Sequence, residues 1–75
     1  MIRVTIKLFA GFRRGRFTSR AREYPPGVTA ARIALDLEIP ESELGIVLVN
    51  GRHADTDRPL QDGETLSLFP MIGGG

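Results

Sequence analysis

The first residues of the chain alternate between apolar and polar side chains. The apolar members are Ile2, Val4, Ile6 and Leu8. A period of two predicts a strand with one buried face and one exposed face, and Phe9 follows on the exposed parity. A weaker alternation from Phe17 to Tyr24 predicts a second strand. The glycine-containing turn at residues 10–16 would join the two strands into a hairpin.

A single helix is predicted after the Pro25-Pro26-Gly27 break. Thr29 is a favourable N-cap residue, because its hydroxyl can accept a hydrogen bond from the first turn. The apolar side chains that follow are spaced i, i+3, i+4 and i+7, which indicates one buried stripe of a short helix. They are Ala30, Ile33, Ala34 and Leu37. Pro40 prevents the helix from continuing.

Three further strands are predicted in the second half. Residues 46–49 are apolar on both parities, which favours a central strand covered on both faces. Asn50-Gly51 is a strong hairpin signal, because a type I′ turn needs positive φ at both positions, and residues 52–54 would be the return strand. Leu60 is expected to enter the core from a loop. Residues 64–69 form the last predicted strand, directly before Pro70.

This order of elements predicts an α+β fold. One helix packed across one mixed sheet of four to five strands buries the apolar stripes economically. We expect the first and last strands to pair in parallel at the centre of the sheet. A chain of 75 residues has room for one domain. We therefore expect a domain over residues 1–70 and a flexible C-terminal tail over residues 71–75.

The tail ends in Gly73, Gly74 and Gly75. Glycine has no side chain to pack and loses much backbone entropy when it is ordered, so such a tail adds nothing to a core. No Cβ stands beside the α-carboxylate of Gly75, and a narrow channel in another protein could therefore admit it. The alternative is a frayed end, since chain termini are commonly disordered.

Composition excludes several function classes. The content of 41% hydrophobic and 25% charged residues indicates a globular protein, and a net charge of +1 argues against nucleic acid or a membrane as the main partner. Without cysteine there is no disulfide, thiol nucleophile or cysteine metal site. No apolar run reaches the roughly 18 residues of a membrane span. The chain starts on a strand pattern, so we expect a cytoplasmic protein without a signal peptide.

Few residues are candidates for chemistry. His53 is the single histidine, and without neighbouring ligand-type residues it predicts no metal site. No catalytic residue is indicated within the chain, because it lacks the spacing of a nucleophile–base–acid triad. Phe9 and Phe69 lie on exposed parities and are candidate docking aromatics, with burial by the tail as the alternative. The arginine-rich turn Arg13-Arg14-Gly15-Arg16 and the strand after it are interpreted as a solvated hairpin. The alternative is that Arg13, Arg14, Arg16, Arg20 and Arg22 bind nucleic acid or an acidic partner face.

Four segments together resemble a known family. They are Ile46-Val47-Leu48-Val49-Asn50-Gly51-Arg52, Leu60-Gln61-Asp62-Gly63-Glu64, Leu68-Phe69-Pro70 and the terminal Gly-Gly. Their order and spacing resemble the ubiquitin-like sulfur carriers of the MoaD/ThiS family, which have the β-grasp fold. This family includes the small subunit of molybdopterin synthase, which the Phe69-Pro70 step favours, and the sulfur carrier of thiamine biosynthesis. Gly73 departs from the family, which usually has a side chain there.

The resemblance implies a specific chemistry at Gly75. A ubiquitin-activating-type enzyme, using ATP and Mg²⁺, would adenylate the Gly75 carboxylate, and sulfur would replace AMP to give a thiocarboxylate. That group would donate sulfur in molybdopterin (molybdenum or tungsten cofactor) biosynthesis. The carrier itself would bind no cofactor and would not be an enzyme.

The resemblance also implies two partners. These are the activating enzyme and the large subunit of molybdopterin synthase or an equivalent acceptor enzyme, so the chain would be a monomer alone or part of a heteromeric complex. Gly73, Gly74 and Gly75 would enter the partner's active site. The docking residues would be Phe9, Phe69, Pro70, Met71 and Ile72.

Three other functions stay open from the sequence. One is a carrier for thiamine-thiazole synthesis, and another is a ubiquitin-like modifier that forms an isopeptide through Gly75. The third is an interaction module that uses the arginine-rich turn and has an idle tail. The fate of Gly75 separates them: thiocarboxylate, isopeptide or free acid. The sequence does not name the acceptor, because that choice lies in the partner's surface.

Overall fold

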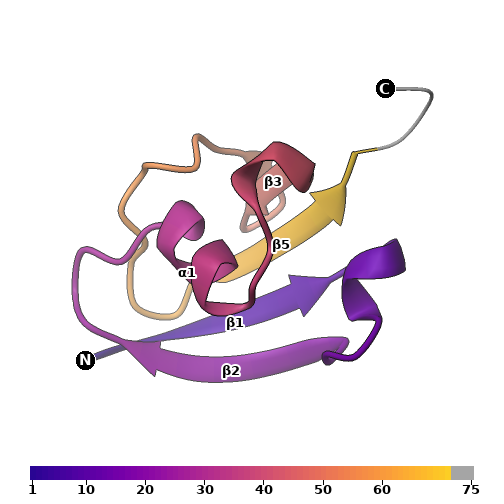
Figure 1. Cartoon of the computed structure of the whole chain (residues 1–75). Helices are drawn as coiled ribbons and strands as arrows, with labels where there is room; N and C mark the ends of the chain where they lie inside the picture. The colour runs from indigo at the N-terminus through magenta and orange to yellow at the C-terminus, as the bar shows by residue number, and fades with distance from the viewer. Residues whose placement is uncertain (72–75) are drawn as a thin grey trace.

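The computed structural model describes residues 1–71, which form one five-stranded mixed sheet with a single α-helix on one face (Figure 1). The elements are β1 (Ile2–Leu8), η1 (Ala10–Arg13), β2 (Ser19–Tyr24), α1 (Ala30–Asp36), η2 (Glu41–Glu43), β3 (Leu44–Val49), β4 (Arg52–His53) and β5 (Thr65–Pro70). The strand order is β2-β1-β5-β3-β4, with η1 and η2 as short 3₁₀ helices. The predicted α+β fold is confirmed.

The first and last strands pair in parallel, as predicted, and β5 is the middle strand. Their register places Ile6 beside Leu66 and Leu8 beside Leu68, and all four side chains are fully buried against the helix side of the sheet. Leu60 is also buried, as predicted from its place in the loop. The core therefore joins residues from both ends of the chain.

Helix α1 starts where the sequence predicts. The Thr29 hydroxyl accepts a hydrogen bond from the backbone N–H of Arg32 at 3.2 Å, which confirms the N-cap. Ile33 and Ala34 turn into the core, whereas Leu35 on the outer side is 63% exposed. The helix has only 7 residues, so it covers one face of the sheet and leaves the other open.

The segment at residues 10–16 was predicted as a simple turn, and this is wrong in two respects. Residues Ala10–Arg13 form a 3₁₀ helix that buries Phe12 to 4% exposure, and β2 begins at Ser19 rather than Phe17. The Arg16 guanidinium donates from Nε to the Leu37 carbonyl at 2.9 Å and from Nη2 to that of Glu38 at 3.3 Å. Arg16 thus satisfies carbonyls at the C-terminal end of α1.

The prediction that residues 46–49 are covered on both faces is also wrong. Val47 and Val49 are buried on the helix side, but Ile46 is 40% exposed and Leu48 half-buried on the open side. The physical reason is that residues 1–71 supply a single α-helix to cover the sheet. The Asn50-Gly51 turn is confirmed, with φ of 53° and 81°, and the Asn50 side chain accepts from the Thr65 N–H at 2.9 Å.

Gly45 lets the end of β5 approach β3 closely. The pairing register of β3 with β5 shifts between Leu44 and Ile46, which is a bulge at Gly45. A Cβ on Gly45 would lie 2.5 Å from the Pro70 carbonyl oxygen and 2.9 Å from the Met71 Cα. Only glycine fits here without displacing the backbone from which the tail departs.

The loop before β5 is braced by Arg58 and Glu64. Two guanidinium nitrogens of Arg58 donate to the two carboxylate oxygens of Glu64 at 3.2 and 3.0 Å, and the Gln61 N–H donates to Glu64 Oε1 at 2.7 Å. The hydrogen bonds from Arg58, and then that from Gln61, hold the pKa of Glu64 below its ordinary value. The Arg58 side chain is 42% exposed, and solvent screening on that side limits the energetic contribution of the ion pair.

Replacing Gly45 with alanine should destabilise the domain by about 1–3 kcal/mol, because the new methyl group overlaps backbone atoms that cannot rotate away. Chemical denaturation measures the change. The matched control is Gly11→Ala, where an added Cβ meets nothing within 4 Å, and it should stay within about 0.5 kcal/mol of the parent protein. Equal stability of both variants would show that the close approach is not a constraint.

Stability should fall in acid through Glu64. The folded-state pKa of Glu64 is depressed. Its contribution to the free energy of unfolding is therefore complete above the ordinary pKa of 4.5 and is lost as pH falls through the folded-state pKa. Glu64→Gln should therefore flatten the dependence of unfolding free energy on pH below 4.5. Arg58→Met should flatten it as well, and the double variant should add nothing further. A Glu64→Gln protein with the parent's pH dependence would contradict this assignment.

Candidate functional site

The candidate site is the end of β5, where the chain leaves the sheet (Figure 1). The Phe9 N–H donates to the Leu68 carbonyl at 3.2 Å, and the Met71 N–H donates to the Glu43 carbonyl at 3.1 Å. Backbone bonds from both flanks therefore hold the strand to its last described residue. Pro70 is half-buried, whereas Met71 is 65% exposed.

The two predicted docking aromatics lie in contact with each other. The rings of Phe9 and Phe69 stack with centroids 4.1 Å apart and planes 8° from parallel. The Arg13 guanidinium carbon lies 5.4 Å from the centroid of the Phe9 ring, while its Nε donates to the Leu8 carbonyl at 2.9 Å. Both rings are half-buried, so each keeps part of its surface available for a partner.

Two further apolar residues extend this surface. Ile46 lies opposite Phe69 in the register of β3 with β5, and Leu48 lies opposite Ser67, one row along the same open face. We call Phe9, Phe69, Ile46 and Leu48 the apolar patch. Ile46 and Leu48 were not predicted as surface residues, because their strand was expected to be covered on both faces. The sequence did contain a signal for their exposure. It predicts one short helix, and one short helix covers only one face of a sheet.

The patch has the composition of a protein interface and no group for acid–base chemistry. Its four side chains carry no nucleophile, acid or base, and aromatic residues with large aliphatic ones are what interface centres contain. Ile72, Gly73, Gly74 and Gly75 of the predicted tail lie outside the described residues. Their predicted roles stay predictions, and so do the docking roles of Phe9, Phe69, Pro70 and Met71.

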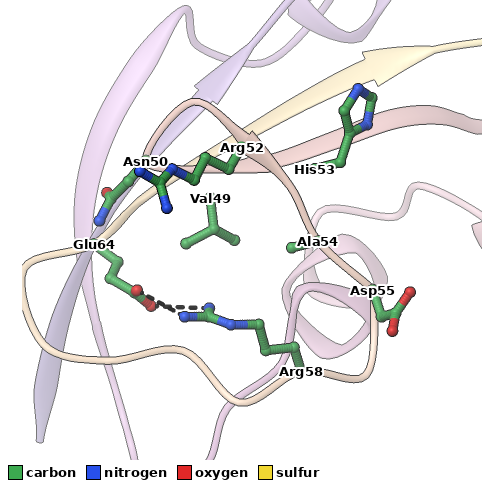
Figure 2. A pocket seen from close by; sticks show the side chains of 8 residues that line it. All are labelled: Val49, Asn50, Arg52, His53, Ala54, Asp55, Arg58 and Glu64. Carbon is green, nitrogen blue, oxygen red and sulfur yellow. Dashed lines mark hydrogen bonds and ion pairs between the residues drawn. The ribbon is translucent and has the colours of Figure 1, made fainter.

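A separate hollow lies at the other end of β5 (Figure 2). It has a volume of about 930 Å³ and is open to solvent, with lining from the β3–β4 hairpin and the loop before β5. Figure 2 shows Arg58 and Glu64 turned toward each other and the His53 ring directed away from the hollow. Because Arg58 and Glu64 are paired with each other, neither is free to act on a molecule bound in the hollow.

Two searches across residues 1–71 bear on other classes of site. No group of three or more His, Cys, Asp or Glu residues in this range could hold a metal ion. None of the helices described is long and apolar enough to cross a membrane. Burial raises the pKa of the Tyr24 hydroxyl at the end of β2, and the neighbouring Arg22 partly offsets this effect.

Comparison with solved structures gives strong matches. A putative molybdopterin converting factor subunit 1 from Pyrococcus furiosus is 24% identical, with a TM-score of 0.75 over 96% of this chain and 100% of that one. The small archaeal modifier protein 1 of H. volcanii is 19% identical, with a TM-score of 0.76 over 96% and 100%. At these identities the likeness shows the fold, which is that of the predicted β-grasp.

A third match is found in a complex of subunits 1 and 2 of the molybdopterin-converting factor from Helicobacter pylori, with 18% identity and a TM-score of 0.66 over 99% of this chain and 100% of that one. No curated protein sequence matched the chain. The sequence model of the ThiS family matches residues 6–75, nearly the whole length. The predicted resemblance is confirmed, and so is the prediction that the chain is not an enzyme, because proteins of this type are non-catalytic carriers or modifiers. This chain belongs to the ThiS family of ubiquitin-like proteins, alongside the MoaD-type sulfur carriers.

Proposed function

We propose that this protein is a sulfur carrier for molybdopterin biosynthesis and that the Gly75 carboxylate is its working group. The observation that carries the proposal is the position of β5. The middle strand of the sheet, bonded on both sides, ends beside the apolar patch and leads directly into the glycine tail. A partner that docks on the patch therefore receives the tail at a defined place.

The chemistry needs activation of the carboxylate by a partner. A carboxylate oxygen attacks the α-phosphorus of ATP, pyrophosphate leaves, and an acyl adenylate forms. A persulfide sulfur on the partner then attacks the acyl carbon, AMP leaves, and reductive cleavage of the S–S bond by a thiol gives the thiocarboxylate. An extended Met71–Gly75 segment spans about 16 Å, enough to reach an active site recessed behind a docking surface.

Two partners follow from this scheme. The first is a ubiquitin-activating-type enzyme that holds ATP and Mg²⁺. The second is an acceptor enzyme, equivalent to the large subunit of molybdopterin synthase, that takes the sulfur. The Helicobacter pylori structure contains subunits 1 and 2 of a molybdopterin-converting factor together, which supports a heteromeric partner for the present chain. Each partner would contact the apolar patch while Gly73, Gly74 and Gly75 enter its active site.

A ubiquitin-like modifier is the second candidate. The observation that favours it is the match with the small archaeal modifier protein 1 of H. volcanii, whose TM-score of 0.76 equals that of the molybdopterin-type match within 0.01. Both functions, like a carrier for thiamine-thiazole synthesis, begin with the same acyl adenylate. They diverge only when sulfur or a lysine amine attacks it, and the attacking group belongs to the partner.

Removal of Gly75 should abolish adenylation, because the new terminal carboxylate lies one residue, about 3.3 Å, short of the bound nucleotide. ATP–pyrophosphate exchange with the cognate activating enzyme measures the first step. The matched control, a chain extended by one further glycine, tests whether the position of the carboxylate matters rather than the number of glycines. Exchange at the parent rate by the shortened chain, or loss of folding on shortening, would contradict the proposal.

Phe69→Asp should weaken binding of the acceptor's large subunit about thirtyfold, because a buried aromatic anchor at an interface contributes about 2 kcal/mol or more. The matched control is Leu35→Asp, which introduces the same charge on the exposed side of α1. Surface plasmon resonance measures affinity, and thermal unfolding measures stability in parallel. If Phe69→Asp lowers stability by as much as it lowers binding free energy, the ring belongs to the core and not to a docking surface.

A further inference from the structure

Charge is distributed very unevenly along this chain. Residues 1–35 contain eight arginine or lysine residues and one acidic residue, whereas residues 36–75 contain two basic and eight acidic residues. The nearly neutral total of +1 therefore conceals a first half of +7 and a second half of −6. Separation of this size indicates that one side of the molecule attracts negatively charged partners.

The fold places much of the positive half along one edge of the sheet. Among residues 1–71, β2 is an edge strand that pairs with β1 alone. Arg20 and Arg22 lie on the face of β2 that is shared with the core side chains of β1, and there Arg20 is exposed and Arg22 half-buried. Their guanidinium carbons lie 4.8 and 5.3 Å from the centroid of the half-buried Phe17 ring, so one aromatic platform holds both cations.

These two cations lack ion-pair partners within residues 1–71. The only acidic residue of the first half, Glu23, lies 3.7 Å from Arg3, and the other ion pairs described are Arg32–Asp36 and Arg58–Glu64. Arg20 and Arg22 are therefore positioned by Phe17 and left without a carboxylate. A partner that supplies carboxylates here displaces no ion pair within the protein.

The backbone of β2 is also available on its outer side. The Leu8 N–H donates to the Thr18 carbonyl at 2.9 Å, and the antiparallel register pairs Ile6 with Arg20 and Val4 with Arg22. Hydrogen-bonded pairs alternate along an antiparallel ladder, so Arg20 and Arg22 direct their backbone groups toward β1. Ser19, Ala21 and Glu23 then direct their N–H and C=O groups outward.

We propose that the outer edge of β2 binds an extended acidic segment of a protein partner, which adds to the sheet as a sixth strand. The outward backbone groups of Ser19, Ala21 and Glu23 would form the ladder. Carboxylates at alternate positions of the segment would face Arg20 and Arg22, because side chains two residues apart on a strand are separated by about 6.6 Å in both chains. This surface is on the helix side of the sheet, so it is distinct from the apolar patch.

Two other occupants fit the same charges less well. A nucleic acid supplies phosphates but no backbone N–H and C=O groups to pair with an open strand edge. In addition, the net charge of −6 on residues 36–75 repels a long polyanion. A second copy of this chain supplies acidic residues, but its Glu41–Glu43 segment is a 3₁₀ helix rather than a strand. An extended acidic segment matches both the charge and the edge.

The test uses the full chain and a labelled peptide of about ten residues in which glutamate and valine alternate, the period of a strand. Fluorescence anisotropy at low ionic strength should show saturable binding, and amide NMR shifts should centre on residues 19–23. A peptide with glutamine in place of glutamate should bind at least about threefold more weakly. No saturable binding of the glutamate peptide overturns the proposal.

Variants separate strand addition from simple charge attraction. Ala21→Pro removes an outward N–H without changing charge or the ladder to β1, and it should weaken binding about tenfold, whereas Ala21→Ser should bind as the parent does. Arg20→Gln and Arg22→Gln should each weaken binding about threefold. The control of matched charge is Arg52→Gln on β4 at the opposite sheet edge, and it should leave binding unchanged.

Four further results would overturn the proposal. They are parent-like binding by Ala21→Pro, an equal loss in Arg52→Gln and Arg20→Gln, self-association in sedimentation that Arg20→Gln abolishes, and tighter binding of a single-stranded oligonucleotide than of the peptide. Thermal unfolding of each variant identifies any that fail to fold. The two arginine variants keep the test decisive if Ala21→Pro is one of these.

Discussion

The parallel pairing of β1 with β5 is the interaction on which the other features depend. It joins the two ends of the chain, with Ile6 beside Leu66 and Leu8 beside Leu68 in a fully buried row. Because the strands are parallel, both end at the same edge of the sheet. The residue after β1, Phe9, therefore meets Phe69 near the end of β5, and their stacking at 4.1 Å is a consequence of the register. The tail follows from that point.

The α-helix described in residues 1–71 has only seven residues, and its small size explains which other surfaces of the sheet stay exposed. One face of the sheet is buried, and the other keeps the apolar patch of Phe9, Phe69, Ile46 and Leu48 open to a partner. The same short helix leaves Arg20 exposed and Arg22 half-buried on β2, where both guanidinium groups lie over the Phe17 ring. The apolar patch and the arginine-bearing edge of β2 thus have the same cause, because a domain of this size has too small a core to cover both. The apolar patch lies on the open face of the sheet, and the charged edge lies apart from it.

Local patterns predicted much of this fold. The alternation in β1, the Thr29 cap and the positive φ values at Asn50-Gly51 each follow from chemistry within a few residues. What the sequence missed depended on contacts between distant segments. Phe12 is buried by a 3₁₀ helix that has no apolar period, and the exposure of Ile46 is set by the absence of a second helix among the described residues. Gly45 is required because the Pro70 carbonyl passes it. At the site, Phe9 and Phe69 were predicted singly, and only the register shows that they form a pair.

The central claim is that Gly75 carries sulfur, and intact-mass spectrometry of the untagged protein from its native cells tests it most directly. Exchange of one carboxylate oxygen for sulfur adds about 16 Da. The account predicts a species of this mass that reacts with a thiol-alkylating reagent. The chain has no cysteine to alkylate, and the reagent also distinguishes the thiocarboxylate from oxidised methionine. Only the free acid, even after incubation with the activating enzyme, ATP and a sulfur donor, or a population joined to other proteins through Gly75, would contradict it.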